Sequence, residues 1–257
     1  MAMLAFVATG FAQKKLVLYF SETQTTQKVA LALQKQLSLP DKAVVAIELV
    51  EPYTGNMMET MQRAQREKQP ALKPLKAKIA DYDIIFLGYP IWSGTYALPI
   101  ASLLKQEDFA GKTIVPFCTF GSGGLESSMA DLKKALPKAT IKPGYGVRQA
   151  RVAAAAKELD RFLKENGYIA GKVKTLPAYS AQQPVTDAEK AIFDAACSSY
   201  QFSLGTPLTF GKRTTDDSID YEFKVKSQGF GGGGESTIYV TMGKEAGAKP
   251  EFTRVVR

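Results

Sequence analysis

The sequence predicts an α/β fold: a doubly wound five-stranded parallel sheet, followed by a small α+β domain with a helix on an antiparallel sheet. Short apolar segments alternate with helical patterns along residues 15–166, which is typical of a parallel sheet with crossover helices. After Gly171 the pattern changes, and three strand-like segments follow one another without a helix between them. A chain of 257 residues is long enough for two such domains.

Strands and helices alternate in the first half. We expect strands at residues 15–19, 43–50, 82–88, 112–119 and 138–147, and helices at 25–37, 57–68, 99–104, 125–136 and 150–166. Pro70, Pro137 and Gly167 stand just beyond three of these helices, where proline and glycine end helical patterns. Pro143 and the glycines on either side of Tyr145 weaken the last strand.

The second half opens with a proline-punctuated linker. Thr186 and Glu189 have the spacing of a capping box, which opens a helix ending near Tyr200. We expect strands at 208–214, 218–227 and 236–242, a fourth at 251–256, and a glycine-rich turn at 229–234. The strand at 218–227 alternates apolar and polar residues, which is typical of one buried face. The predicted division is a leader at 1–13, the parallel-sheet domain at 14–170, a linker at 171–185 and the second domain at 186–257.

The composition excludes several kinds of chemistry. The chain has no histidine, which excludes His-ligated metals, Ser-His triads and histidine proton shuttles. No cluster of Cys, Asp and Glu replaces them, so we expect no metal site. The two cysteines, Cys118 and Cys197, are interpreted as small hydrophobic residues rather than a disulfide framework. Demanding chemistry would therefore come from an organic cofactor.

The charge and the N-terminus bear on partners and location. The net charge is +8, but the lysines are scattered, and no aromatic-basic run indicates a nucleic-acid partner. Residues 1–12 are too few and too interrupted to span a bilayer. They have the apolar middle of a signal peptide and a small residue, Ala12, near a cleavage point, without a basic n-region. We expect export, with a cytoplasmic protein that has an apolar leader as the alternative.

Three loops each follow an apolar strand and precede a helical pattern, at residues 19–28, 88–95 and 119–124. In an open parallel sheet, ligands bind at the carboxyl ends of the strands, where such loops converge. We therefore expect the loops to form the walls of one ligand site. The candidate residues are Ser21, Glu22, Thr23, Gln24, Thr25 and Thr26 in the first loop, Tyr89, Pro90, Ile91, Trp92, Ser93 and Gly94 in the second, and Thr119, Phe120, Gly121, Ser122, Gly123 and Gly124 in the third.

The first 155 or so residues after the leader resemble the flavodoxin family, especially flavodoxin-like bacterial proteins with a Tyr-Pro-x-Trp second loop, matched here by residues 89–92. The family's first loop reads Ser/Thr-x-Thr-Gly-x-Thr. Ser21, Thr23 and Thr26 match it, whereas Gln24 stands where glycine is usual. The resemblance implies that residues 14–170 bind flavin mononucleotide (FMN), and that an exported form lies in the bacterial periplasm or cell envelope.

The first loop also has the chemistry of a phosphate site. Hydroxyls and free backbone N–H groups at a helix N-terminus bind anions, and the terminal phosphate of FMN suits them. The alternative is an ordinary Ser/Thr helix cap without a ligand. If the position of Gln24 needs a positive φ, its side chain strains the loop and affects the affinity for FMN rather than the location of the site.

The other two loops would surround the flavin ring. The resemblance places Trp92, the only tryptophan, against the isoalloxazine ring, where stacking adds to simple burial. Tyr89 and Pro90 shape the turn. The small residues of the third loop let backbone groups approach the flavin edge. Phe120 either contacts the flavin ring as a second aromatic residue or packs beneath the third loop as a structural staple that holds the loop in place.

The resemblance implies a redox function, in which FMN accepts electrons or a hydride at N5 and passes them on. The family includes electron carriers and NAD(P)H-dependent reductases, so the redox partner is left open, and we name no catalytic residue. Carrier flavodoxins are typically acidic, so the charge of +8 favours a reductase or an exported redox protein. The alternative is a binding module in which Gln24 has abolished flavin binding and the fold is a scaffold for the C-terminal domain.

Residues 186–257 faintly resemble the cystatin-like arrangement of a helix followed by antiparallel strands. Tyr221, Phe223, Tyr239 and Phe252 lie on the strands that carry this likeness. Inhibitory cystatins have a Gln-x-Val-x-Gly hairpin where this chain has residues 214–218. The resemblance therefore implies an accessory domain that binds a protein partner, rather than a protease inhibitor.

Overall fold

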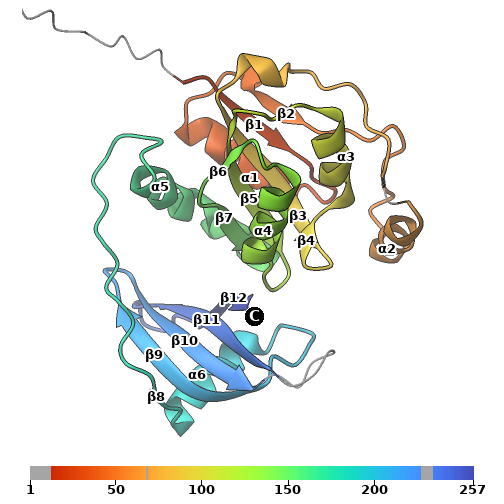
Figure 1. Ribbon diagram of the computed structural model, residues 1–257. Helices are drawn as coiled ribbons and strands as arrows, with labels where there is room; N and C mark the ends of the chain where they lie inside the picture. The colour runs from red at the N-terminus through yellow and green to blue at the C-terminus, as the bar shows by residue number, and fades with distance from the viewer. Residues whose placement is uncertain (1–12, 68, 227–233) are drawn as a thin grey trace, which may run out of the picture.

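The computed structural model describes residues 13–67, 69–226 and 234–257 and contains two separate sheets (Figure 1). The first sheet is parallel and has helices on both faces; the second is antiparallel and packs against one helix. The predicted fold class is therefore confirmed. The predicted leader at 1–13, except for Gln13, and the predicted glycine-rich turn at 229–234, except for Gly234, lie outside the described residues.

The first sheet has the strand order β2-β1-β3-β5, with β6 and β7 following one another along the far side of β5. Its strands are β1 (Lys15–Tyr19), β2 (Val44–Ala46), β3 (Ile84–Trp92), β5 (Thr113–Phe120), β6 (Thr140–Ile141) and β7 (Tyr145–Arg148), and β4 (Thr95–Tyr96) forms a hairpin with β3. The helices are α1 (Thr25–Gln36), α2 (Met57–Arg66), α3 (Leu98–Gln106), α4 (Leu125–Ala135) and α5 (Ala155–Glu165), with short 3₁₀ turns η1 (Asp41–Ala43), η2 (Ile79–Asp81) and η3 (Gln149–Ala154).

The parallel sheet separates two apolar cores. Val17 and Leu18 are neighbours on β1, but Val17 packs with α1 and α5, whereas Leu18 packs with α3 and α4. Both side chains are fully buried. A strand covered on both faces needs apolar residues at nearly every position, which explains the continuous apolar runs of β1 and β3.

The second strand is shorter than predicted because the chain leaves the sheet early. β2 ends at Ala46, whereas the pattern predicts a strand to residue 50. The N–H of Val50 donates to the carbonyl of Ala71 at 2.9 Å, and the N–H of Lys73 donates to Glu48 at 2.8 Å. The end of the predicted strand therefore pairs with the segment after α2 instead of with β1.

The fifth strand is interrupted at the proline. The N–H of Lys142 continues the ladder to the carbonyl of Ile114 at 2.9 Å, but Pro143 has no N–H to donate. The strand resumes as β7 at Tyr145. The helix predicted at 150–166 begins as the 3₁₀ turn η3 and becomes α-helical at Ala155.

The second sheet has the order β12-β11-β10-β9-β8. Its strands are β8 (Gln183–Pro184), β9 (Thr206–Thr214), β10 (Ser218–Lys226), β11 (Glu235–Gly243) and β12 (Glu251–Val256), and its helix is α6 (Asp187–Cys197). Phe193 of α6 packs against Phe223 of β10, with ring centroids 5.2 Å apart. Thr186 is the N-cap residue of α6, but its hydroxyl bonds to the Glu189 carboxylate rather than to a backbone amide.

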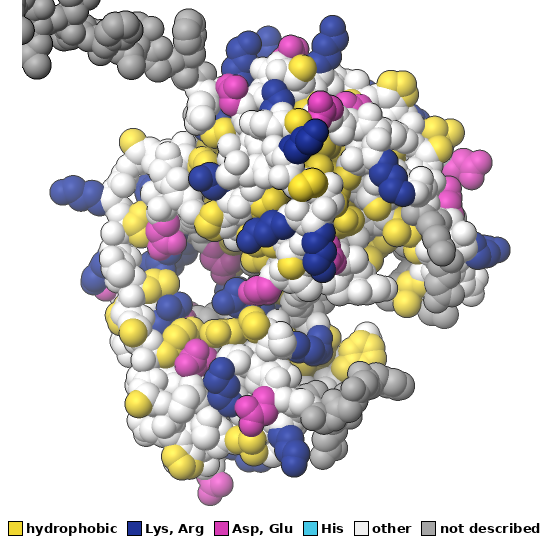
Figure 2. All heavy atoms as spheres, in the orientation of Figure 1, with side chains coloured by type: hydrophobic (Ala, Val, Ile, Leu, Met, Phe, Trp, Pro, Cys, Tyr) yellow, Lys and Arg dark blue, Asp and Glu magenta, His cyan; other side chains and the backbone are white. Residues whose placement is uncertain are grey.

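The surface carries mixed charge. On the face shown in Figure 2, Lys and Arg side chains are spread among acidic side chains over both domains, which agrees with the scattered lysines of the sequence. None of the described helices is both long and apolar enough to cross a membrane.

Gly88 provides a test of the packing at the centre of the sheet. A Cβ atom at this position would lie 2.0 Å from a ring carbon of Phe117. We expect Gly88→Ala to lower the free energy of unfolding by about 1–3 kcal/mol, because the ring has to move. Gly234→Ala is the control, since no atom lies within 4 Å of its added Cβ. Denaturant unfolding measures both, and equal effects would contradict this account.

Candidate functional site

The three predicted loops meet at the carboxyl edge of the parallel sheet (Figure 1). The hydroxyls of Thr26, at the start of α1, and Thr119, at the end of β5, hydrogen-bond at 2.8 Å. Ser127 of α4 donates to the carbonyl of Gly94 at 2.5 Å. Gly124 lies against Ile91, and a Cβ at Gly124 would be 2.6 Å from a methyl carbon of that side chain. The first loop therefore contacts the third, and the third contacts the second.

The first loop ends in a helix N-terminus with free polar groups. α1 begins at Thr25 without a side-chain cap, and the amides of a first helical turn have no acceptor within the helix. The hydroxyl of Ser21 is buried and has no hydrogen-bond partner in the described part of the chain. An unpartnered buried hydroxyl costs free energy unless a ligand bonds to it. The helix dipole favours an anion at the same place.

Gln24 adopts the conformation that glycine adopts most easily. It is the N-cap residue of α1, with φ 61° and ψ 1°, in the left-handed region. The loop has therefore not adjusted to the larger residue. A left-handed conformation costs a residue with a Cβ about 1–2 kcal/mol.

Glu22 is held by the helix that follows the second strand. The hydroxyl of Thr60, on α2, donates to the Glu22 carboxylate at 2.6 Å, and Thr60 is buried. This bond fixes α2 beside the first loop. The sequence analysis missed Thr60, because nothing in the polar pattern of α2 distinguishes one hydroxyl from the rest.

The second loop is mostly strand, which corrects the prediction of a loop at 88–95. β3 continues to Trp92, and β4 pairs back on it, with Trp92 beside Thr95. Only Ser93 and Gly94 form the turn, with φ values of 49° and 86°. Positive φ at both central residues is the geometry of a tight two-residue hairpin. Pro90 lies in the ladder beside Thr119 of the third loop.

Trp92 belongs to a cluster of three aromatic rings. Its half-buried ring packs edge-to-face against Phe20 at 5.8 Å and Tyr53 at 5.3 Å between centroids. The guanidinium of Arg63 lies 4.8 Å above the Tyr53 ring, and the Tyr53 hydroxyl is buried without a hydrogen-bond partner among the described residues. Phe20 was not a candidate, although its place between β1 and Ser21 was a usable signal.

Two candidate side chains lie in the core beneath the loops. Tyr89 is fully buried, and its hydroxyl bonds to Ser128 at 3.1 Å. Burial raises the pKa of Tyr89 far above the ordinary value, so the phenol keeps its proton. Phe120 is also buried. The burial of Phe120 favours the staple role over a ring contact, and both residues can offer a ligand only their backbone.

Gly121 and Ser122 of the third loop are contacted by two residues that the sequence analysis missed. The Nε of Arg148, at the end of β7, donates to the carbonyl of Gly121 at 2.8 Å. The N–H of Val255, on β12, donates to the carbonyl of Ser122 at 2.7 Å. A single arginine and a single valine carry no local signal of such a role.

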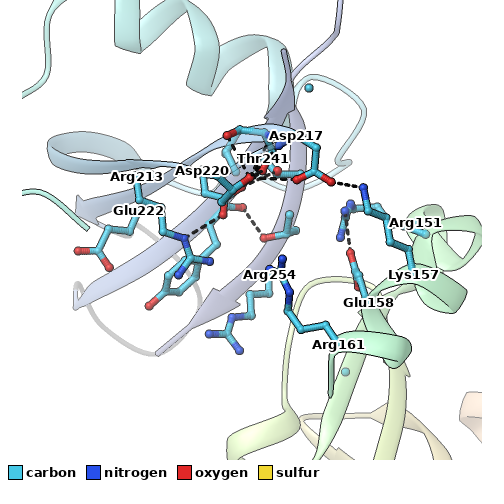
Figure 3. Close-up of a pocket in the computed structure, with 18 of the residues that line it drawn as sticks. Arg151, Lys157, Glu158, Arg161, Arg213, Asp217, Asp220, Glu222, Thr241 and Arg254 are labelled. Atoms are coloured by element: carbon cyan, nitrogen blue, oxygen red, sulfur yellow. Dashed lines mark hydrogen bonds and ion pairs between the residues drawn. The ribbon is translucent and has the colours of Figure 1, made fainter. Parts of the chain in front are cut away.

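A separate cavity of about 770 Å³ lies between α5 and the polar face of the second sheet. Figure 3 shows that charged side chains from both domains line it; Lys157 of α5 pairs with Asp217, and Arg213 pairs with Asp220 at 2.9 Å. No candidate residue of the three loops lines this cavity. It is therefore distinct from the site at the sheet edge.

The first domain has known relatives. The family model described as Flavodoxin matches residues 14–164. Among solved structures, a flavoprotein from Bacteroides uniformis ATCC 8492 is 26% identical, with a TM-score of 0.50, over 58% of this chain and 99% of its own. One from Bacteroides eggerthii DSM 20697 is 28% identical, with a TM-score of 0.46, over 58% of this chain and 99% of its own. A Lactobacillus acidophilus NCFM flavoprotein in complex with FMN is 20% identical, with a TM-score of 0.44, over 57% of this chain and 99% of its own. No curated protein matches the chain.

The hydroxyl pair that joins the first and third loops can be tested alone. We expect Thr26→Val and Thr119→Val each to lower the free energy of unfolding by about 1–3 kcal/mol, because each leaves the other hydroxyl buried without its partner. The double variant should cost less than the sum, by about 1 kcal/mol. Urea unfolding of the four proteins measures this, and strictly additive effects would contradict a direct bond.

Proposed function

Because the chain belongs to the flavodoxin family, we propose that it is an FMN-binding redox protein whose cofactor site is formed by the three loops. The observation that carries the proposal is the buried hydroxyl of Ser21, which has no partner among the described residues and lies beside the uncapped N-terminus of α1. An anion there would accept hydrogen bonds from Ser21 and from the first-turn amides. The terminal phosphate of FMN has the charge and the acceptor atoms for this position.

The aromatic cluster supports the ring end of the site. The cluster offers an apolar surface in which Trp92 and Tyr53 are partly exposed and the buried Phe20 packs edge-to-face against the Trp92 ring. The Tyr53 hydroxyl, which has no partner in the described part of the chain, is a hydrogen-bonding group for the polar edge of a flavin. We assign ring contact to Trp92 and Tyr53, and phosphate binding to Ser21 and the amides of Thr25 and Thr26.

When bound, FMN supplies reversible electron transfer. The chain then binds the phosphate, orients the ring and excludes water from one side of it. The function is electron transfer or NAD(P)H-dependent reduction, for an exported bacterial protein in which a cystatin-like accessory domain binds a protein partner. The net charge of +8 favours an acidic partner over a basic one.

The test is a titration of the purified chain with FMN and with riboflavin, which lacks the phosphate. We expect a bound-flavin absorption spectrum and quenching of the fluorescence of Trp92, the only tryptophan. Ser21→Ala should weaken FMN binding about tenfold or more and leave riboflavin binding unchanged, because it removes one hydrogen bond to a charged group.

The control for this test is Ser102→Ala. Ser102 carries another buried hydroxyl without a partner among the described residues, but it lies on α3 and belongs to none of the three loops. We expect Ser102→Ala to leave FMN affinity unchanged. A colourless wild-type protein that ignores added FMN, or equal losses in the two variants, would contradict the proposed site.

The second candidate function is a flavin-free binding module, and the left-handed Gln24 favours it. If FMN binds as proposed, the wild-type protein binds FMN without any substitution. Gln24→Gly then only relieves backbone strain and raises the free energy of unfolding by about 0.5–1 kcal/mol. Gln24→Ala, which keeps a Cβ, should show no such gain. If only Gln24→Gly takes up FMN, the module is the correct function. Thermal unfolding and released flavin measure the two effects.

A further inference from the structure

The third loop is held from outside by the second domain. Val255 of β12 forms a parallel bridge with Gly123, and its N–H donates to the carbonyl of Ser122 at 2.7 Å. The approach is close, because a Cβ at Gly123 would lie 2.3 Å from the Val255 carbonyl oxygen. β12 is the edge strand of its sheet, so the loop takes the place of a further strand.

Arg148 ties the same loop to the same strand. Its Nε donates to Gly121 at 2.8 Å, and its Nη1 donates to the carbonyl of Phe252 at 2.9 Å. Its guanidinium lies 4.2 Å from the Phe252 ring centroid and 5.5 Å from that of Tyr200. Arg148 is buried, with 8% of its surface exposed, and no carboxylate of the described residues pairs with it. A charged donor therefore bonds a loop of one domain and a strand of the other.

These bonds fix which way the loop amides point. In a trans peptide the C=O and N–H groups point in opposite directions, and the described chain has no cis peptide. The carbonyls of Gly121 and Ser122 point toward Arg148 and β12. The amide of Ser122 therefore points away from Arg148, and the amide of Gly123 points away from β12. Neither donates to an acceptor in the described part of the chain.

We propose that Arg148 is a positioning residue through which the C-terminal domain completes the flavin site, by aiming the amides of Ser122 and Gly123 at the flavin. This inference rests on the proposed FMN function. N–H donors stabilise the negative charge that a flavin gains on reduction, and they do so best in a rigid, partly dry site. The second domain thus sets both the affinity for FMN and the ease of its reduction.

The experiment compares wild type with Arg148→Met, Arg148→Lys and Arg151→Met, all as full chains. We expect Arg148→Met to bind FMN about tenfold more weakly and to lower the reduction potential of bound FMN, because the orientation of the Ser122 and Gly123 amides is no longer fixed. Arg148→Lys keeps the positive charge but lacks the planar guanidinium with its several N–H donors. It should therefore recover part, but not all, of the affinity for FMN.

Arg151→Met is the matched control, because Arg151 lies at the same interface (Figure 3) and only 13% of its side chain is exposed. It pairs with Glu158 and with Glu251 of β12, each at 2.9 Å, but it does not bond to the third loop. We expect FMN affinity within twofold of wild type and an unchanged potential. An equal shift in Arg151→Met, or no shift in Arg148→Met, would overturn the proposal.

A flavin-free measurement separates this inference from the function on which it rests. Hydrogen exchange of the flavin-free chain should show faster exchange at Val255 in Arg148→Met than in wild type or Arg151→Met. If wild type binds no FMN, the proposed function fails, and the assignment of Arg148 to the flavin site fails with it. If wild type binds FMN while exchange, affinity and potential are all unchanged in Arg148→Met, only the positioning role fails.

Discussion

The parallel register of β1, β3 and β5 is the constraint on which the site depends. Tyr19 pairs with Gly88, and Gly88 pairs with Phe117, so the three strands end at one edge. Packing between β3 and β5 is tight at this point, because the ring of Phe117 occupies the space that a side chain at Gly88 would need. From this edge the chain places the start of α1, the β3–β4 hairpin and the third loop within contact of one another. A shift of one residue would reverse the faces of a whole strand and separate the loops.

Three departures from ordinary packing lie at this same edge. The hydroxyls of Ser21 and Tyr53 are buried without partners among the described residues, and Gln24 is left-handed. In the core beneath, the Tyr89 hydroxyl bonds to Ser128, whereas the Ser102 hydroxyl on α3 is buried without a partner among the described residues. Strain and unpaired polar groups persist where the surrounding fold enforces them, and natural proteins keep them mainly at functional sites. Three such features at one edge support the proposed site on grounds other than family resemblance.

The sequence was sufficient for features with a local cause. Apolar runs identified β1 and β5, and Pro143 signalled the break between β6 and β7. The hairpin at Ser93 and Gly94 was missed because its turn chemistry was interpreted as part of a longer loop, although Ser-Gly between strand residues allows it. The candidate loops do meet, yet which side chains face a ligand depended on burial, which periodicity does not give for loop residues. The contact of Val255 with Ser122 joins residues far apart in the chain, and no local pattern encodes it.

The third loop has little apolar surface, and this determines how the second domain contacts it. Its glycines offer little apolar surface, so a second domain cannot hold it by hydrophobic packing and bonds its carbonyls instead. Bonds to backbone carbonyls constrain orientation as well as position, since each peptide plane is rigid. Coupling between two sites is reciprocal. A ligand that orders the third loop therefore tightens its contact with β12, and a partner that pulls β12 away from Gly123 must weaken that ligand by the same factor. If Arg148 has the proposed role, the second domain and the site at the sheet edge are coupled through the third loop.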